Sequence, residues 1–293
     1  MNRLITTAIA IAIGTAVGLP TARATLFVVT RGSDTDDGAC DGHCTLREAI
    51  NAANDLAGLD TIGFNIDTRD PSIIPTISPV SPLPSITSPA VIDATTQFAG
   101  RVQLNGENAG VDANGLRITA GGSTVRGLVI NRFDGNGILL VTGGGNTIQG
   151  NFIGTNITGT VALPNGDVGS GVRISNSPDN LIGGSQSAQR NLISGGHPGY
   201  GVWIFGTSAT GNRVLGNYIG TNVAGTAPLP NLIGVNIWAS NNTIGGPQPG
   251  EGNVISGNRY GANIEIFDGG SGASGNRIQG NFIGTNITGT VAL

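Results

Sequence analysis

The sequence contains no lysine, because all fourteen of its basic residues are arginine. Catalysis through a lysine Schiff base or a lysine general base is therefore excluded. Charge is scarce as well: residues 25–114 carry four arginines against twelve acids, and residues 115–293 carry eight against six. Binding of nucleic acid needs a strongly basic surface. We therefore expect no nucleic acid among the partners of this chain.

Glycine, by contrast, supplies 50 residues, and apolar residues make up 38% of the chain, with Ile, Val and Leu prominent. Glycine is costly inside helices, which excludes a helical bundle. The apolar content argues against disorder. Many glycines among β-branched residues predict an all-β protein of short strands joined by tight turns.

Residues 1–24 have the pattern of a secretory signal peptide. Arg3 is followed by an apolar stretch from Leu4 to Leu19, and Ala22-Arg23-Ala24 forms a cleavage site. The alternative is a membrane anchor, although the stretch is short for a span of about 20 residues. We expect a secreted or cell-surface protein that is not embedded in the membrane.

Both cysteines, Cys40 and Cys44, follow shortly after this segment. Export favours a disulfide between them. The alternative is a metal site formed with Asp41 and His43, although a second pair of ligands is missing.

A nearby acidic run offers oxygen ligands for Ca²⁺ through Asp34, Asp36 and Asp37. Its spacing does not match an EF-hand loop, so a solvated turn is the preferred interpretation. No other metal and no cofactor is expected.

Internal repetition is the strongest signal. The hexapeptide N-[FY]-I-G-T-N begins at Asn151, Asn217 and Asn281, so the offsets are 217 − 151 = 66 and 281 − 217 = 64. A second landmark is Gly followed by an alternating apolar strand, and the shortest step between two of these is 137 − 115 = 22 residues. Such a step fits three short strands and three turns. The pattern predicts a right-handed parallel β-helix.

Alternation within each strand predicts which side chains face inward. The expected inward pairs are Leu116/Ile118, Ile138/Leu140, Val172/Ile174, Val202/Ile204, Val235/Ile237 and Ala262/Ile264. A single coil buries too little to offset its lost backbone entropy, so coils must stack. Asparagines two residues before an Ile or Val recur in most coils, and we expect them to stack as hydrogen-bonded ladders.

Two loop types alternate between coils. One is IGTNxxGTxxL, at residues 153–163, 219–229 and 283–293, and the other is IGGxxxxxxN, at residues 182–191 and 244–253. We expect the first type, with Val161 and Leu163, to fold over an outward apolar stripe. The stripe consists of Phe152, Leu192, Tyr218, Val254 and Phe282.

Residues 25–60 are expected to form an N-terminal cap. A first strand, TLFVV, precedes the capping box that Thr45 and Glu48 would form. The helix from there to about Asn54 would cover the first coil with Leu46, Ile50 and Ala53. Residues 61–114 are expected to form irregular first coils, with a proline-rich loop or covering strand over 71–89.

Regular repeats are expected over residues 115–293. The last sixteen residues, 278–293, repeat residues 148–163 letter for letter, but no further strand follows them. We therefore expect either a longer solenoid of which this chain is a part, or end-to-end self-association.

The segment CTLREAINAAN, preceded by DDGACDGH, resembles the CSLREA-type motif of bacterial secreted proteins, with Thr45 in place of its Ser. The repeats resemble those of right-handed parallel β-helices of the pectin-lyase-like superfamily. Together the two resemblances cover the chain after residue 24. They imply export, an N-terminal cap and a β-helix, but no assigned activity.

Members of that superfamily include enzymes that cleave or epimerise acidic polysaccharides. The motifs of polygalacturonase-like enzymes, N-T-D, D-D, G-H-G and R-I-K, do not occur in the coils, residues 61–293, and His197 between Gly196 and Pro198 is interpreted as an exposed turn residue. A glycosidase needs two carboxylates at a controlled separation. The acids of the coils are Asp134, Asp167, Asp179, Glu251, Glu265 and Asp268, of which only the last three fall near one another along the chain.

The outward side of the strand that follows each landmark glycine is the better candidate site. Both tryptophans are expected there, in adjacent coils, with Trp238 beside Glu265. Sugar rings stack on flat aromatic side chains flanked by polar groups. The candidate carbohydrate-binding residues are Arg173, Trp203, Phe205, Asn236, Trp238, Asn263 and Glu265.

Ordinary cross-strand packing is the simpler interpretation of the same residues. The leading hypothesis is an exported structural or adhesion-type β-helix that binds a polysaccharide or a cell-surface partner on this face. The alternative is a polysaccharide lyase, glycoside hydrolase or epimerase.

Overall fold

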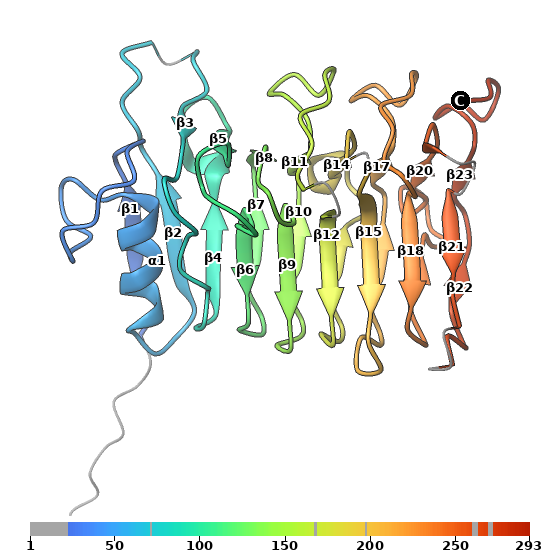
Figure 1. The fold of residues 1–293 in the computed structure, drawn as a ribbon, viewed down its shortest axis with the longest axis horizontal. Helices are drawn as coiled ribbons and strands as arrows, with labels where there is room; N and C mark the ends of the chain where they lie inside the picture. The colour runs from blue at the N-terminus through green and yellow to red at the C-terminus, as the bar shows by residue number, and fades with distance from the viewer. Residues whose placement is uncertain (1–22, 71, 167–168, 197, 260–262, 269–271) are drawn as a thin grey trace, which may run out of the picture.

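The chain forms a right-handed parallel β-helix (Figure 1). The computed structural model describes residues 23–70, 72–166, 169–196, 198–259, 263–268 and 272–293. Each regular coil contributes one strand to each of three parallel sheets, A, B and C, in the chain order C, A, B. The predicted fold class is therefore confirmed. His197 and Ala262 lie outside the described residues.

Sheet A is the longest of the three. In spatial order its strands are β1 (Leu26–Val29), β2 (Asp60–Phe64), β4 (Ala90–Asp93), β7 (Thr124–Arg126), β10 (Thr147–Gln149), β13 (Leu181–Gly183), β16 (Arg213–Leu215), β19 (Thr243–Ile244) and β22 (Arg277–Ile278).

The strands of sheet B are β3 (Thr76–Ile77), β5 (Val102–Asn105), β8 (Leu128–Asn131), β11 (Phe152–Ile153), β14 (Leu192–Ile193), β17 (Tyr218–Ile219), β20 (Val254–Ile255) and β23 (Phe282–Ile283). Those of sheet C are β6 (Leu116–Ile118), β9 (Ile138–Val141), β12 (Ser170–Ser175), β15 (Tyr200–Phe205), β18 (Val235–Trp238) and β21 (Ile264–Ile266). Three helical segments accompany the sheets, α1 (Leu46–Asn54), η1 (Ala94–Thr96) and η2 (Ser187–Gln189).

The core is a column of aliphatic side chains from all three sheets. In sheet C, Val172, Val202 and Val235 lie in register from coil to coil. The predicted inward pairs of the first five of these coils are confirmed, because each side chain is at most 1% exposed. Stacking thus gives every inward residue a neighbour above and below.

The glycine next to the first residue of each of the first five sheet C strands has a steric cause. A Cβ atom built on Gly201 would lie 2.5 Å from the carbonyl oxygen of Gly234 in the next coil and 2.7 Å from Ile219 Cγ2 of sheet B. Gly171 meets the same two kinds of neighbour, Gly201 and Ile193. Only glycine lets the backbone of one coil approach both the next coil and the core.

Two asparagine ladders run along the corners, as predicted. In the ladder before sheet B, Asn191 Nδ2 donates to Asn217 Oδ1 at 2.9 Å, and Asn217 Nδ2 donates to Asn253 Oδ1 at 3.0 Å. Each Oδ1 also accepts from the backbone N–H of the preceding Asn. The second ladder, before sheet A, links Asn146, Asn180, Asn212, Asn242 and Asn276. Burial of these amides is tolerated because they are fully hydrogen-bonded.

The last coil differs from the prediction by two residues. Ile264 pairs with Val235 rather than with Ile237, and Ile266 takes the position opposite Ile237. Asn263 provides the carbonyl that accepts from the Val235 N–H. Asn263 thus occupies the structural position that Gly234 has one coil earlier.

The outward stripe of sheet B is in register, and its members Leu192, Tyr218 and Val254 are covered as expected, whereas Phe282 in the last coil is 40% exposed. Leu192, Tyr218 and Val254 are at most 5% exposed, and Ile287 packs against them. The inserts project beside the coils (Figure 1) and join each other, because Val223 N–H donates to Gly159 and Ile287 N–H to Gly225. The expectation for Val161 was wrong: it is 52% exposed, because it lies on the outer arm of its insert.

The N-terminal cap also follows the prediction. Thr45 and Glu48 form the capping box of α1, whose buried face includes Leu46, Ile50 and Ala53. Cys40 and Cys44 form a disulfide, so their sulfurs are not free to bind a metal. Within the described part of the chain, no helix combines the length and apolar character that a membrane span requires.

An acid beside sheet A gives stability that depends on pH. Asp93 accepts from Arg126 Nη2 at 2.6 Å and from the Thr95 N–H at 3.1 Å. Burial by itself would raise the pKa of Asp93, but the hydrogen bonds from Arg126 and Thr95 lower it below its ordinary value of 3.8. An acid whose folded-state pKa is lowered stabilises the fold above its unfolded pKa and loses that contribution as the pH falls through the folded pKa.

We therefore expect Asp93→Asn to lower the free energy of unfolding at pH 7 by about 1–2 kcal/mol. The difference from wild type should shrink once the pH falls below 3.8. Urea unfolding at neutral and acidic pH measures both effects. If the difference in free energy of unfolding between wild type and Asp93→Asn instead grows in acid, the lowered pKa of Asp93 is contradicted.

Candidate functional site

The candidate site is a row of aromatic side chains on the outside of sheet C. Trp203 and Phe205 project from β15, and Trp238 projects from β18 in the next coil. Register places Arg173 beside Trp203 and Phe205 beside Trp238, as predicted. We call the surface formed by these residues and their neighbours the aromatic face; its members are Arg173, Tyr200, Trp203, Phe205, Asn236, Trp238, Glu265 and Phe267.

The rings of the aromatic face form a continuous chain of contacts. Trp203 has its ring centroid 5.3 Å from Tyr200, 5.5 Å from Phe205 and 5.8 Å from Trp238. The chain continues with Trp238 and Phe267, whose centroids are 4.6 Å apart. Edge and tilted geometries such as these add stabilisation beyond simple burial. The face is thus a rigid ridge that spans three coils along the axis.

A cation closes one end of the ridge. The guanidinium carbon of Arg173 lies 4.2 Å from the centre of the Trp203 ring, which is a cation–π contact. Burial lowers the pKa of Arg173 from its ordinary value. Among the described residues Arg173 makes no ion pair. An anionic or hydroxyl-rich partner would therefore find an unneutralised cation here.

A carboxylate lies at the other end. Asn236 Nδ2 donates to Glu265 Oε2 at 2.8 Å, and Asn236 is fully buried. The prediction that Glu265 lies beside Trp238 was wrong, because β21 is shifted by two residues and Phe267 contacts Trp238 instead. The same shift removes Asn263 from the face, since its side chain accepts from Asn258 at the corner.

Unsatisfied polar atoms gather on this face. Six buried side-chain atoms in the described residues lack a hydrogen-bond partner, and four of them belong here. They are Arg173 Nε, Trp203 Nε1, Asn236 Oδ1 and Trp238 Nε1. Buried polar groups are rarely left unpaired in proteins. The ridge therefore combines apolar rings with unused hydrogen-bonding capacity.

Two members of the face were missed by sequence reasoning. Phe267 had a usable signal, because Val202-Trp203-Ile204-Phe205 and Ile264-Glu265-Ile266-Phe267 share an aliphatic-x-Ile-aromatic pattern. Aligning on that pattern instead of on the glycine gives the observed register. Tyr200 lies before the strand pattern, and nothing in the repeat indicates its contact with Trp203.

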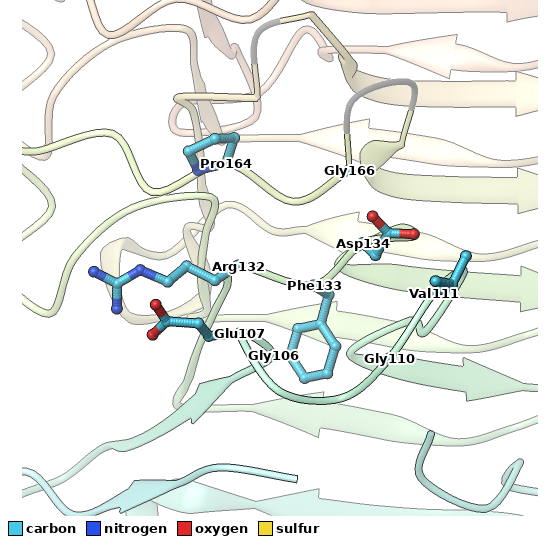
Figure 2. Close-up of a pocket in the computed structure, with 9 residues that line it drawn as sticks. All are labelled: Gly106, Glu107, Gly110, Val111, Arg132, Phe133, Asp134, Pro164 and Gly166. Carbon is cyan, nitrogen blue, oxygen red and sulfur yellow. The ribbon is translucent and has the colours of Figure 1, made fainter. Parts of the chain in front are cut away.

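A cavity of about 350 Å³ lies elsewhere, between the loops that lead from sheet B to sheet C. It contains Glu107, Arg132 and Asp134, with Phe133 at its centre (Figure 2). The two carboxylates point away from each other on opposite sides of Phe133. Glycosidase chemistry needs two carboxylates that face one bond, and this arrangement does not provide them.

Glu251 and Glu265, two of the acids considered for catalysis, are also separated. Glu251 lies 3.8 Å from Arg213 in the loop between sheets A and B, whereas Glu265 lies on sheet C. The acidic run that contains Asp34 was predicted to be a solvated turn, but it includes a buried side chain. Asp34 is 3% exposed, and its Oδ2 lies 2.7 Å from Arg47 Nη2. Within the described ranges, no three His, Cys, Asp or Glu residues form a group suited to a metal ion.

No protein-family model and no curated protein sequence matches this chain. Among solved structures, the complex of XylC with xylose aligns with a TM-score of 0.44 and 14% identity, over 75% of this chain and 34% of that one. The crystal structure of pectate lyase Pel9A aligns with a TM-score of 0.33 and 14% identity, over 92% and 81% of the two chains. This chain thus spans about a third of the XylC chain.

Proposed function

We propose that this chain is an exported, non-catalytic β-helix of structural or adhesion type that binds a carbohydrate chain along the aromatic face. The observation that carries the proposal is the continuous ridge from Trp203 through Trp238 to Phe267. Coils repeat about every 4.8 Å, so the ridge places tilted aromatic rings of successive coils along one axis. A linear polymer of sugar rings suits such a surface better than a compact ligand does.

The polar groups at the ends of the ridge support a sugar ligand. Arg173 supplies a cation and Glu265 a carboxylate, and the indole N–H groups of both tryptophans, which have no partner among the described residues, are buried and would donate to a sugar hydroxyl only after a shift of the rings exposes them. Sugar hydroxyls both donate and accept, so they suit a mixture of this kind. Packing alone would not favour unpaired indole N–H groups at two successive positions.

The test uses the two tryptophans directly, because the chain has no others. We expect intrinsic tryptophan fluorescence to change when the full chain is titrated with at least one soluble polysaccharide from a panel of xylan, glucomannan, dextran and polygalacturonate. Retention on the same polymers should weaken at least tenfold in the Trp203→Ala, Trp238→Ala double variant, because stacked aromatic rings typically dominate such contacts.

Phe98→Ala is the matched control, since Phe98 is 82% exposed and belongs to the first coils. Its retention should equal that of wild type. Thermal unfolding of all variants shows whether loss of the rings has disturbed the coils. Unchanged fluorescence and unchanged retention across the panel would reject a binding role. Release of new reducing or unsaturated ends would instead establish an enzyme.

A further inference from the structure

A row of three cavities follows the turns that connect sheet A to sheet B, on a different side of the molecule from the aromatic face. Their volumes are about 500, 190 and 410 Å³. The first two share Arg101 and Gly150, and the second and third share Arg190 and Tyr218. The three cavities are therefore adjacent along the axis, and together we call them the arginine groove.

Two arginines in the groove lie over aromatic rings of sheet B. The guanidinium carbon of Arg101 lies 3.8 Å from the centre of the Phe152 ring, and that of Arg190 lies 4.2 Å from the centre of the Tyr218 ring. Backbone carbonyls fix both side chains, since Arg101 Nη1 donates to Gly150 and Arg190 Nε donates to Gly216, each at 3.1 Å.

Strand register sets the spacing of the two stacks. Phe152 pairs with Leu192, which pairs with Tyr218, so the two rings are two coils apart. At about 4.8 Å per coil, this separation is about 10 Å. Two fixed cations therefore recur along the axis at an interval that a linear polymer can match.

Neither cation is neutralised by the protein. Arg126 also lines the groove, but it pairs with Asp93. Arg101 and Arg190 make no ion pair in the part of the chain that the structure describes. The lining residues include no acid, and nearby Glu251 faces Arg213. Arg101 is partly buried, and this burial lowers its pKa.

We propose that the arginine groove binds the oxyanion groups, sulfate or phosphate esters, of a linear anionic polymer. Stacking on a ring occupies the flat side of a guanidinium and leaves its N–H edge available. Arg101 and Arg190 each use one nitrogen for a backbone carbonyl, and the other nitrogens can donate to an oxyanion. A charge-assisted pair of this kind is stronger than a neutral hydrogen bond, and the anion offsets the partly buried charge.

The first test compares polymers of the same backbone. We expect the full chain to bind dextran sulfate, dextran phosphate or both in preference to uncharged dextran, and to do so more weakly as salt is added. Preference between the two charged polymers distinguishes sulfate from phosphate esters as the ligand. Equal binding of uncharged dextran, or no binding of either charged polymer, overturns the proposal.

Variants then locate the site. Arg101→Gln with Arg190→Gln should lower the affinity for the preferred polymer at least tenfold. Arg117→Gln with Arg277→Gln removes the same charge from exposed positions of sheets C and A outside the groove, and should change affinity less than twofold. An equal loss in both double variants means general electrostatic attraction and overturns the groove as the site.

A measurement on the wild-type chain covers the case in which the arginine variants do not fold. Phenylglyoxal modifies accessible guanidinium groups, and peptide mass mapping reports each position. Saturating polymer should protect Arg101 and Arg190 at least fivefold, while exposed Arg117 and Arg277 stay reactive. Uniform protection, or none, contradicts the proposal. Tryptophan fluorescence follows the aromatic face independently, so the two proposals can fail separately.

Discussion

Replacing Gly201 with alanine is expected to lower the free energy of unfolding by about 3 kcal/mol, because an added methyl group has no space there. Its position would be 2.5 Å from the Gly234 carbonyl oxygen, 2.7 Å from Ile219 Cγ2 and 3.0 Å from Asn231 Nδ2. A backbone carbonyl cannot rotate away as a flexible side chain does. Relief therefore requires the coils to separate, which weakens the strand pairing between β15 and β18.

Gly42→Ala provides the control for this substitution. No atom lies within 4 Å of the Cβ position at Gly42, and the residue is exposed. Its free energy of unfolding should stay within about 0.5 kcal/mol of wild type. Chemical denaturation of the three proteins measures the difference. If Gly201→Ala unfolds at the wild-type denaturant concentration, then the close approach of the coils at this corner is incorrect.

An aspartate in place of Asn217 should destabilise the chain by about 3–5 kcal/mol at neutral pH. Asn217 is fully buried, and its Nδ2 donates to the carbonyls of Ile182 and Leu215 and to Asn253 Oδ1, at 2.9–3.0 Å. A carboxylate keeps the shape but replaces two donated protons with a negative charge that faces three acceptor oxygens. Burial disfavours the ionised form, so the destabilisation should decrease as the pH is lowered.

The same change at Asn156 is the matched control. Asn156 Oδ1 accepts from the backbone N–H groups of Thr160 and Val161 at 2.9 and 3.1 Å. A carboxylate still accepts both of these bonds, and the insert is open to solvent. Thermal and urea unfolding of Asn156→Asp should therefore resemble wild type. Similar losses at both positions would mean that the ladder has no special role in stability.

Much of the fold can be read from the sequence because one physical requirement repeats in every coil. Val202 and Ile204 must face inward, and Gly201 must precede them where the backbone passes close to the core. The asparagine ladders were predictable for a similar reason, since Asn217 lies on the same side of its strand as Ile219.

The last coil shows where this reasoning ends. A glycine marks the start of a sheet C strand only where that glycine is the residue whose backbone passes close to the next coil. In the last coil Asn263 occupies that position, so alignment on Gly261 misplaced Glu265 by two residues and omitted Phe267 from the candidate site. The aromatic at the end of the strand was the more reliable marker.

The arginine groove was beyond prediction for another reason. Arg101 and Phe152 are 152 − 101 = 51 residues apart, and the intervening loops vary in length. No periodic signal connects an arginine just before one sheet B strand to a ring on the sheet B strand two coils later. Contacts of this kind depend on loop paths, which are set by local packing rather than by the repeat.

The inserts join every second coil, through Val223 with Gly159 and Ile287 with Gly225, and this has a consequence for how such chains change size during evolution. Loss or duplication of a single coil would place an insert beside a loop of the other kind and leave its hydrogen bonds without partners. Gene rearrangements compatible with folding are therefore those that add or remove pairs of coils, about 65 residues at a time, as the offsets of 66 and 64 residues indicate. Viable changes in length therefore keep the two kinds of coil in alternation.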